Sequence, residues 1–415
     1  MSAKLNTVAD VCIDNDRLLQ RIAQLGRIGA LEGGGVCRLA LTEEDRQGRD
    51  QVRRWMEELG LHVGIDRIGN VIGVRAGRKD GPPVMIGSHI DTVATGGLYD
   101  GNLGVLAGLE VVATLNDAGI ETNRPVAVGF FTNEEGARFA PDMMGSGVHQ
   151  GSLDLDEMLN VRGIDGTSVR DDLSRIGYAG AAPVGEFQAY CFCELHVEQG
   201  PVLEEQRIDI GAVTGVQGIS WTEYRITGVS NHAGTTPMRL RHDAGYVAAA
   251  IAFEARRLAV EFGNDQVATV GVNQLQPNLV NVIANHALVT VDLRNTDDKL
   301  LKQAEDCMAE FVMQTAREEG VEVSNRRLAR FAPVKFNASM IGLVEETAQG
   351  LGYSVKRLPS GAGHDAQMFA PNCPTSMIFV PSHGGISHNI REHTEPEHIQ
   401  AGANTLLQVV MAQAN

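Results

Sequence analysis

The sequence predicts an α/β fold in which a larger domain, a mixed sheet covered by helices, is interrupted by a smaller ferredoxin-like α+β domain. Helical and strand patterns alternate through the first third of the 415 residues, which favours a mainly parallel sheet between helices. From about Val213 to Asn325 the order of patterns changes to β-α-β-β-α-β, which is typical of a ferredoxin-like domain. Beyond this segment the chain resumes helix, strand and glycine-rich loops, so the small domain is predicted to be an insertion.

The elements of the first third follow from hydrophobic periodicity and flanking residues. Thr42-Glu43-Glu44 places a capping residue and acidic side chains at the start of a predicted helix. Gly33-Gly34-Gly35 is expected to form a loop, because it lacks the spacing of a phosphate-binding motif. The patterns predict helices at Asp16–Leu25, Thr42–Leu59 and Leu103–Ala118, and strands at Leu61–Asp66, Asn70–Arg75, Val84–Ser88 and Pro125–Phe131.

The inserted segment has its own pattern of two helices and four strands. Asp243 is expected to cap the first of these helices. The segment predicts strands at 218–230, 266–276, 286–295 and 321–329, and helices at 243–257 and 298–317. A last helix is expected at Glu397–Met411. The larger domain therefore comprises 1–212 and 330–415, and the inserted domain comprises 213–329.

Composition excludes several classes of partner. The chain carries 52 Asp+Glu against 35 Lys+Arg, a formal charge of −17, and has no block of basic residues. Such a surface repels nucleic acid phosphates and anionic lipids, so we expect neither nucleic acid nor membrane as a partner.

The chain is expected to be cytoplasmic. Its N-terminus lacks the basic start and apolar core of a signal peptide, and no stretch approaches the ~20 apolar residues that span a bilayer. The six cysteines are scattered and form no C-x-x-C metal pattern, which favours free thiols in a reducing compartment.

Chemistry-bearing side chains follow several predicted strands. The stretch GSHIDTVATGGLYDG, residues 87–101, holds His89, Asp91 and Asp100 just beyond the strand at Val84–Ser88. In open α/β sheets, ligands gather beyond the carboxyl ends of the strands. The alternative is that these are ordinary turn residues, since Asp favours turns.

Three further windows repeat this arrangement. They contain Glu134 and Glu135 in FFTNEEGARF, His196 in FCELHVEQGP and His388 in SHGGISHNIREHTEPEHI. Taken singly, each has an ordinary alternative, such as a solvated glutamate pair or a core histidine. Because every window supplies imidazole or carboxylate near a strand end, we interpret them together as one site.

The combination of residues suits a pair of divalent metal ions. Imidazole and carboxylate bind Zn²⁺ at roughly 2.0–2.2 Å, and one carboxylate can bridge two ions about 3.5–4 Å apart. His89 and Asp100 are therefore interpreted as ligands, and the spare glutamate as a proton shuttle. Asp91, two residues beyond His89, is expected to orient the His89 imidazole.

These windows, together with NHAGTTPM and SGAGHDA, resemble the di-zinc aminoacylase/carboxypeptidase superfamily. They are most similar to its ureido-hydrolysing branch of N-carbamoyl-L-amino acid hydrolases, β-ureidopropionases and allantoate amidohydrolases, and the resemblance spans essentially the whole chain. It implies that one ion is held by His89, Asp100 and His196, and the other by Asp100, Glu135 and His388. It also implies that Glu134 is the general base and that Asp91 supports the ligands.

The resemblance implies roles for the inserted domain as a lid and dimerisation domain. His232 would polarise the scissile carbonyl, and Asn281 and Arg294 would hold the substrate carboxylate, with Gln199, Gly361 and Gly363 beside them. A planar guanidinium grips a carboxylate with two hydrogen bonds, as an amino-acid-like substrate requires. The implied cofactors are two ions per chain, Zn²⁺ or Mn²⁺, Co²⁺ and Ni²⁺, which suit the same ligands. A homodimer is the implied assembly.

The predicted function is metal-dependent hydrolysis of the linear ureido C–N bond of an N-carbamoyl-L-amino acid, yielding the amino acid, ammonia and CO₂. Glu134 is expected to deprotonate the attacking water and to return the proton to the leaving amine. Allantoate amidohydrolase and β-ureidopropionase remain alternatives, because they share the ureido and carboxylate groups. An aminoacylase or dipeptidase is a further alternative, and a non-catalytic metal-dependent binding protein is the alternative of another class.

Overall fold

A computed structural model describes residues 11–263 and 265–415 of the chain. The prediction that no signal peptide is present falls partly on residues 1–10, outside the described residues. The chain divides into two compact units: unit 1 ends at Thr214 and resumes at Lys335, and unit 2 runs from Gly215 to Val334. The predicted domain boundaries at 212/213 and 329/330 fall inside two continuous strands, where composition gives no signal of a change.

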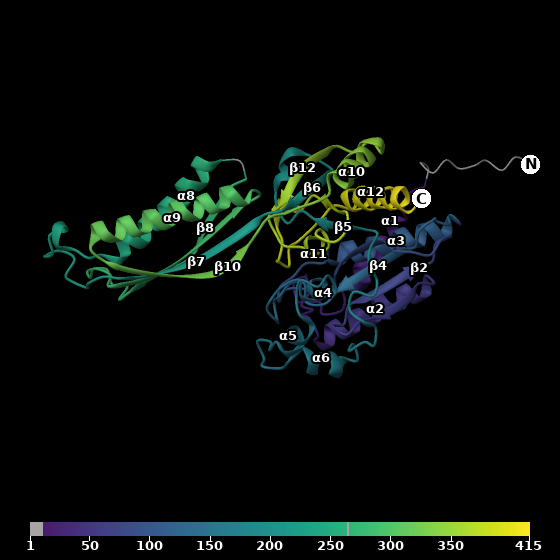
Figure 1. The fold of residues 1–415 in the computed structure, drawn as a ribbon, viewed down its shortest axis with the longest axis horizontal. Coiled ribbons are helices and arrows are strands. Elements are labelled where there is room, and N and C mark those ends of the chain that lie inside the picture. The colour runs from purple at the N-terminus through teal and green to yellow at the C-terminus, as the bar shows by residue number, and fades with distance from the viewer. Residues whose placement is uncertain (1–10, 264) are drawn as a thin grey trace, which may run out of the picture. The chain divides into compact units, whose positions relative to one another are not determined.

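Unit 1 is built on a nine-stranded mixed sheet (Figure 1). Its strands run in the order β1-β2-β4-β3-β5-β13-β6-β11, and β12 pairs with β6. Their bounds are β1 His62–Ile65, β2 Val71–Arg75, β3 Val84–His89, β4 Val126–Phe131, β5 Cys191–Val197, β6 Ile210–Val216, β11 Val334–Lys335, β12 Val355–Ser360 and β13 Thr375–Val380. A larger mixed sheet is the architecture that the sequence predicts.

The centre of this sheet is formed by four parallel strands in the order β4-β3-β5-β13. Every residue of these four strands is buried, as their apolar runs of Val, Ile and Phe require. Parallel strands of this kind are covered on both faces, so the only open positions lie at the strand ends. The carboxyl ends of all four strands meet along one edge, and that edge positions the site.

Helices pack around the sheet of unit 1. Among them, α3 and α12 contact each other and the central strands, and α3 is buried along almost its whole length. The helices are α1 Asn15–Leu25, α2 Glu43–Glu58, α3 Asn102–Asp117, α4 Met144–His149, α5 Leu155–Asn160, α6 Val169–Ile176, α7 Val202–Gln206, α10 Ala338–Gly350, α11 Asp365–Phe369 and α12 Pro396–Ala414. The sequence predicts α1, α2, α3 and α12 to within three residues at each end. It misses α4 to α7, which have five to eight residues each and therefore show little periodicity.

Unit 2 contains a four-stranded antiparallel sheet in the order β10-β7-β9-β8. Along the chain its elements are β7 Gly218–Thr227, α8 Ala244–Phe262, β8 Val267–Gln276, β9 His286–Asn295, α9 Asp298–Glu319 and β10 Glu322–Phe331. This is the β-α-β-β-α-β order expected from the sequence. The two helices contact each other and β9, and Val247, Ile251 and Met308 lie in the shared core. Asp243 caps α8, as predicted, by accepting the N–H groups of Gly245 and Tyr246.

Two further properties concern the helices and the cysteines of the described residues. None of the helices within 11–263 and 265–415 combines the length and apolar character needed to cross a bilayer. All six cysteines are free thiols.

Candidate metal centre

Of the three groups of potential metal ligands among the described residues, one is formed by Glu194, His196 and His364, and the two that share Asp100 lie at the carboxyl ends of the central strands. Nε2 of His89 and Nε2 of His196 lie 3.6 and 3.2 Å from Oδ1 of Asp100. In the second group, Nε2 of His388 lies 3.5 Å from Oδ2 of Asp100 and 3.3 Å from Oε2 of Glu135. Asp100 belongs to both groups, and in each group the ligand atoms lie within 4.8 Å of one another.

The spacing of these atoms fits a shared cation. Ligand atoms placed about 2.0–2.1 Å from one tetrahedral ion lie roughly 3.4 Å apart. The separations of 3.2 and 3.6 Å around Oδ1 of Asp100 match this value. Strand order explains the arrangement, because His89 ends β3, His196 lies near the end of β5, and His388 follows β13.

The two buried histidines present the nitrogen that a metal needs. Nδ1 of His89 lies 2.9 Å from the carbonyl oxygen of Asp91, and Nδ1 of His196 lies 2.9 Å from the carbonyl oxygen of Val197. A carbonyl oxygen only accepts, so in each neutral ring Nδ1 carries the proton and Nε2 keeps its lone pair. The backbone N–H of Gly101 donates to Nε2 of His196, which agrees with this tautomer.

A glycine allows the loop of Asp100 to approach His89. Gly101 has a φ of 66°, in the left-handed region, and a Cβ at this position would lie 2.4 Å from the His89 ring. Any other residue would therefore push the Asp100 carboxylate away from the histidine.

Asp91 contacts the His89 ring through its backbone and the loop after β4 through its carboxylate. Its carbonyl oxygen, and not its carboxylate, takes the hydrogen bond of the His89 ring. The two carboxylate oxygens instead accept the backbone N–H groups of Glu134 and Glu135, at 3.3 Å each. Asp91 therefore links the end of β3 to the loop after β4.

Glu134 lies beside the ligands and belongs to neither group. Its side chain is 9% exposed, and Oε2 lies 3.4 Å from Nε2 of His89. Burial raises the pKa of Glu134 well above its usual range; the attraction of His89 opposes this, and the repulsion of Asp365 and Glu135 adds to it. A buried carboxyl group with a raised pKa is suited to accept and release a proton.

The charges of the site also fit bound cations. Burial, followed by the repulsion of Asp100, raises the pKa of Glu135 well above its usual range. The cavity at the ligands measures about 100 Å³, and no lysine or arginine is among the described residues that line it. Burying several carboxylates without a compensating cation is costly, so divalent ions with imidazole and carboxylate preferences suit this donor set.

Several residues around this cavity are implied by the resemblance, and others are not. Gln199 lines the cavity, and its Nε2 donates to Oδ2 of Asp100 at 2.8 Å. Gly363 also lines it, whereas Gly361 lies just beyond β12 and is not in the lining. Asp142 lines the cavity as well and is not among the residues that the sequence predicts. Because Asp142 is separated from Glu134 by an irregular loop, no periodicity or motif in the sequence points to it.

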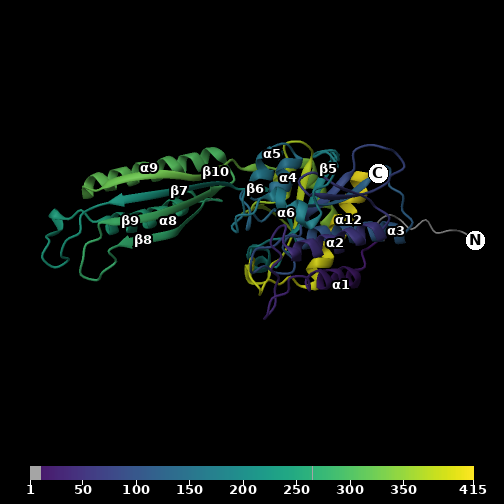
Figure 2. The same ribbon diagram turned by 90° about the horizontal axis from the view of Figure 1, so that it is seen from below.

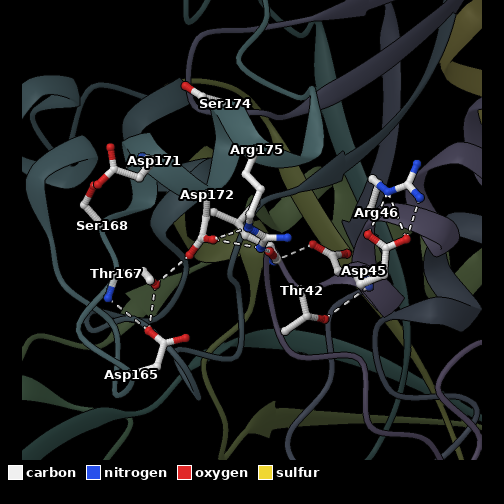
Figure 3. A network of polar contacts seen from close by, with 12 residues as sticks. Thr42, Asp45, Arg46, Asp165, Thr167, Ser168, Asp171, Asp172, Ser174 and Arg175 are labelled. Carbon is white, nitrogen blue, oxygen red and sulfur yellow. Dashed lines mark hydrogen bonds and ion pairs between the residues drawn. The ribbon is translucent and has the colours of Figure 1, made fainter.

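The loop that carries Glu134 and Glu135 contacts a polar network around the buried Asp172, part of which Figure 3 shows. Asp172 accepts hydrogen bonds from Thr167 and Arg175 at 2.8 Å, as the dashed lines show. Its Oδ2 also accepts from Arg138, 2.7 Å away. Arg138 lies shortly after Glu134 in the same loop, and its guanidinium donates to the carbonyl oxygen of Ala40. The network therefore joins this loop to the segment before α2.

In unit 2, two of the three predicted residues lie together. The backbone N–H of Ala233 donates to the carbonyl of Asn281, and His232 is bridged to Val282, so the segments of His232 and Asn281 run side by side. Arg294 lies elsewhere, near the end of β9, where its guanidinium donates to the carboxylate of Asp292. Figure 2 shows the loops after β7 and between β8 and β9 at one end of this sheet.

Comparisons with known proteins agree with this geometry. Residues 85–412 match the model of Peptidase family M20/M25/M40. The chain is 40% identical over 403 residues to an N-carbamoyl-L-amino-acid amidohydrolase from Rhizobium meliloti, with 97% of each chain covered. It is 33% identical over 392 residues to an allantoate amidohydrolase from Bacillus subtilis (strain 168), covering 93% of this chain and 94% of that one. An amidase of the hydantoinase/carbamoylase family from Burkholderia multivorans has a similar crystal structure, with a TM-score of 0.96, 44% identity, and coverage of 97% of this chain and 98% of that one. The chain belongs to Peptidase family M20/M25/M40.

Proposed function

We propose that the chain is a metal-dependent amidohydrolase that cleaves the linear ureido C–N bond of N-carbamoyl-L-amino acids. The observation that carries this proposal is the pair of ligand groups sharing Asp100, with the unliganded Glu134 beside them. The relative from Rhizobium meliloti bears the name of this activity at 40% identity, against 33% for the allantoate amidohydrolase, which ranks the carbamoyl amino acid first.

His89, Asp100 and His196 would hold one divalent ion, and Asp100, Glu135 and His388 the other. When bound, such ions supply Lewis-acid polarisation of the substrate carbonyl and make a water molecule more acidic. Glu134 takes a proton from the attacking water and returns it to the leaving amine. The carboxylate of Asp91 accepts the backbone N–H of Glu134 and so keeps Glu134 in place. The products are the amino acid, ammonia and CO₂.

His232 is suited to stabilise the carbonyl oxygen as it becomes negative. Its Nδ1 accepts the backbone N–H groups of Gly234 and Thr235, at 3.0 and 3.2 Å. The proton of the neutral ring is then on Nε2, which makes Nε2–H a hydrogen-bond donor. A donor held in advance at the developing oxyanion is the usual source of the largest catalytic effect.

We further propose that Arg294 and Asn281 bind the substrate carboxylate, beside Gln199, Gly361 and Gly363, and that unit 2 acts as a lid and as the dimerisation domain. Asp292 supports the role of Arg294 by orienting the guanidinium. His232 and Asn281 adjoin the His286 end of β9, whereas Arg294 is eight residues further along that strand, about 26 Å at ~3.3 Å per residue. One small substrate cannot contact both ends, so a homodimer in which two copies share each site reconciles these roles.

The alternatives differ in testable ways. Allantoate amidohydrolases and β-ureidopropionases share the ureido and carboxylate groups of the substrate. An aminoacylase or dipeptidase acts on an ordinary amide, and a non-catalytic binding protein has no use for the unliganded Glu134. The free thiols and the acidic composition are in keeping with a cytoplasmic enzyme.

The test is a substrate panel. The protein is stripped with a chelator, reconstituted with Zn²⁺, Mn²⁺, Co²⁺ or Ni²⁺, and assayed for ammonia release from N-carbamoyl-L-amino acids, β-ureido acids and allantoate. Dipeptides are assayed by release of amino acid. The highest kcat/KM is expected for an N-carbamoyl-L-amino acid. A preference for dipeptides would favour the aminoacylase or dipeptidase alternative. Binding without turnover of any substrate would favour the non-catalytic binding protein.

A further inference from the structure

Glu392 contacts the backbone of the ligand Asp100 and belongs to neither ligand group. It is 6% exposed and stands between the loop of His388 and α12. Its Oε1 accepts two backbone N–H groups, from Tyr99 at 2.9 Å and from Asp100 at 3.0 Å. These contacts join the loop after β3 to the segment after β13, which is almost 300 residues away along the chain.

The same carboxylate reaches the second ligand group through Ser387. The hydroxyl of Ser387 lies 2.8 Å from Oδ2 of Asp100 and 3.3 Å from Oε2 of Glu392. Since Ser387 directly precedes His388, whose φ is 52°, this hydroxyl ties the backbone of one ligand to the carboxylate of another. The other ligand oxygen, Oδ1 of Asp100, faces His196.

The loop that carries Asp100 passes so close to Glu392 that there is no space for a side chain at Gly97. A Cβ on Gly97 would lie 2.2 Å from Oε1 of Glu392, closer than any real contact. The φ of Gly97 is not in the left-handed region, so backbone conformation does not require this glycine. The space itself is the reason that a glycine stands here.

We propose that Glu392 is a positioning residue: it fixes Asp100 so that each carboxylate oxygen faces one ligand group, and it thereby sets the affinity for the second cation. The inference rests on the two-ion site of the proposed function. A carboxylate that accepts two N–H groups from the segment of a ligand restricts that ligand's rotation, and loss of such supporting contacts typically weakens metal binding by about 10- to 100-fold.

The experiment measures metal binding, independently of turnover. Chelator-stripped wild type, Glu392→Ala, Glu392→Gln and Glu395→Ala are titrated with Zn²⁺ against a fluorescent competitor, and circular dichroism establishes that each is folded. Wild type is expected to bind two ions. Glu392→Ala should keep the tighter ion and bind the second about tenfold or more weakly. Glu392→Gln keeps an acceptor oxygen for both amides and should restore affinity to within a few-fold.

Glu395→Ala is the matched control, because this exposed glutamate in the same segment pairs with His393 and lies outside the ligand groups. It should bind both ions as wild type does. Gly97→Ala provides a second test should Glu392→Ala fail to fold, because its methyl group displaces Glu392 and should weaken the same ion.

Wild-type affinity for both ions in Glu392→Ala, or in Gly97→Ala, would overturn the inference while leaving the proposed function intact. So would a Glu392→Gln variant as weak as the alanine variant, because the acceptor role would then be wrong. If wild type binds fewer than two ions, the two-ion site of the proposed function fails, and the inference fails with it.

Discussion

His196 directs its Nε2 at Oδ1 of Asp100 across 3.2 Å, although His196 lies on β5 and Asp100 lies in the loop between β3 and α3. The other oxygen of Asp100 faces the second ligand group. Removal of the Asp100 side chain therefore takes a ligand from both groups.

The first prediction follows from that arrangement. Asp100→Ala is expected to lose both ions, because neither group keeps more than two of its three ligands. Metal content after dialysis, measured by elemental analysis, checks it. Asp142→Ala is the control, since Asp142 lines the same cavity and belongs to neither group. Full occupancy in Asp100→Ala would remove its bridging role.

The second prediction separates the two adjacent glutamates. Glu134→Gln keeps the size and polarity of the side chain but cannot accept the proton, so kcat should fall by about 10²-fold or more with metal content unchanged. Glu135→Gln should instead lower the affinity for one ion. Steady-state kinetics and metal titration of both variants decide the matter, and a Glu134→Gln variant with wild-type turnover would exclude Glu134 as the base.

The third prediction concerns Arg294. Lysine cannot reproduce the two parallel hydrogen bonds of a guanidinium, so Arg294→Lys should lose about tenfold or more in kcat/KM, as expected for one charge-assisted hydrogen bond of about 1.5–3 kcal/mol. The loss should appear with an N-carbamoyl amino acid and largely disappear with its carboxamide, which wild type should already use poorly.

Arg225→Lys is the matched control for this variant. Arg225 pairs with Glu223 two residues away on β7, as Arg294 pairs with Asp292 on β9. Equal rates of wild type on the acid and the carboxamide would discard the carboxylate clamp.

The fourth prediction concerns the sharing of sites between two copies. His232→Ala and Arg294→Ala are each expected to be nearly inactive. After the two variants are unfolded and refolded together, one site of each mixed dimer is intact, so about a quarter of wild-type activity should return. Each variant refolded alone is the control. No recovery, with mixed dimers demonstrated by differently tagged chains, would place both residues in one copy's site.

The fifth prediction is one of stability. Asp172 is buried and pairs with the buried Arg138 and the exposed Arg175, so Asp172→Ala leaves the buried Arg138 guanidinium without that partner. The free energy of unfolding should fall by about 3 kcal/mol. Asp171→Ala removes its exposed neighbour, which accepts from Ser168, and should cost less than about 1 kcal/mol. Denaturant melts of both variants provide the measurement, and equal midpoints would contradict the role of this network.

Much of the fold could be predicted because its signals are local. The apolar runs at Val84–Ser88 and Pro125–Phe131 and the periodic helices around them depend on a few neighbouring residues each. Strand ends then indicated where His89, Glu134, His196 and His388 should meet, since the carboxyl ends of parallel strands share one edge. The short helices α4 to α7 were missed because each offers barely two turns of pattern.

The sequence by itself determined the residue types of the site and the strands that deliver them. Only the tertiary structure decided how they touch: the Asp91 carboxylate holds Glu134 and Glu135 instead of His89, Asp142 enters the cavity, and Glu392 reaches the backbone of Asp100. The tertiary structure also places His232 beside the segment that precedes β9 and Arg294 near the other end of β9. The physical reason is that hydrogen bonds act over about 3 Å, and which groups come that close across hundreds of residues depends on how whole strands and loops pack, which no local pattern encodes.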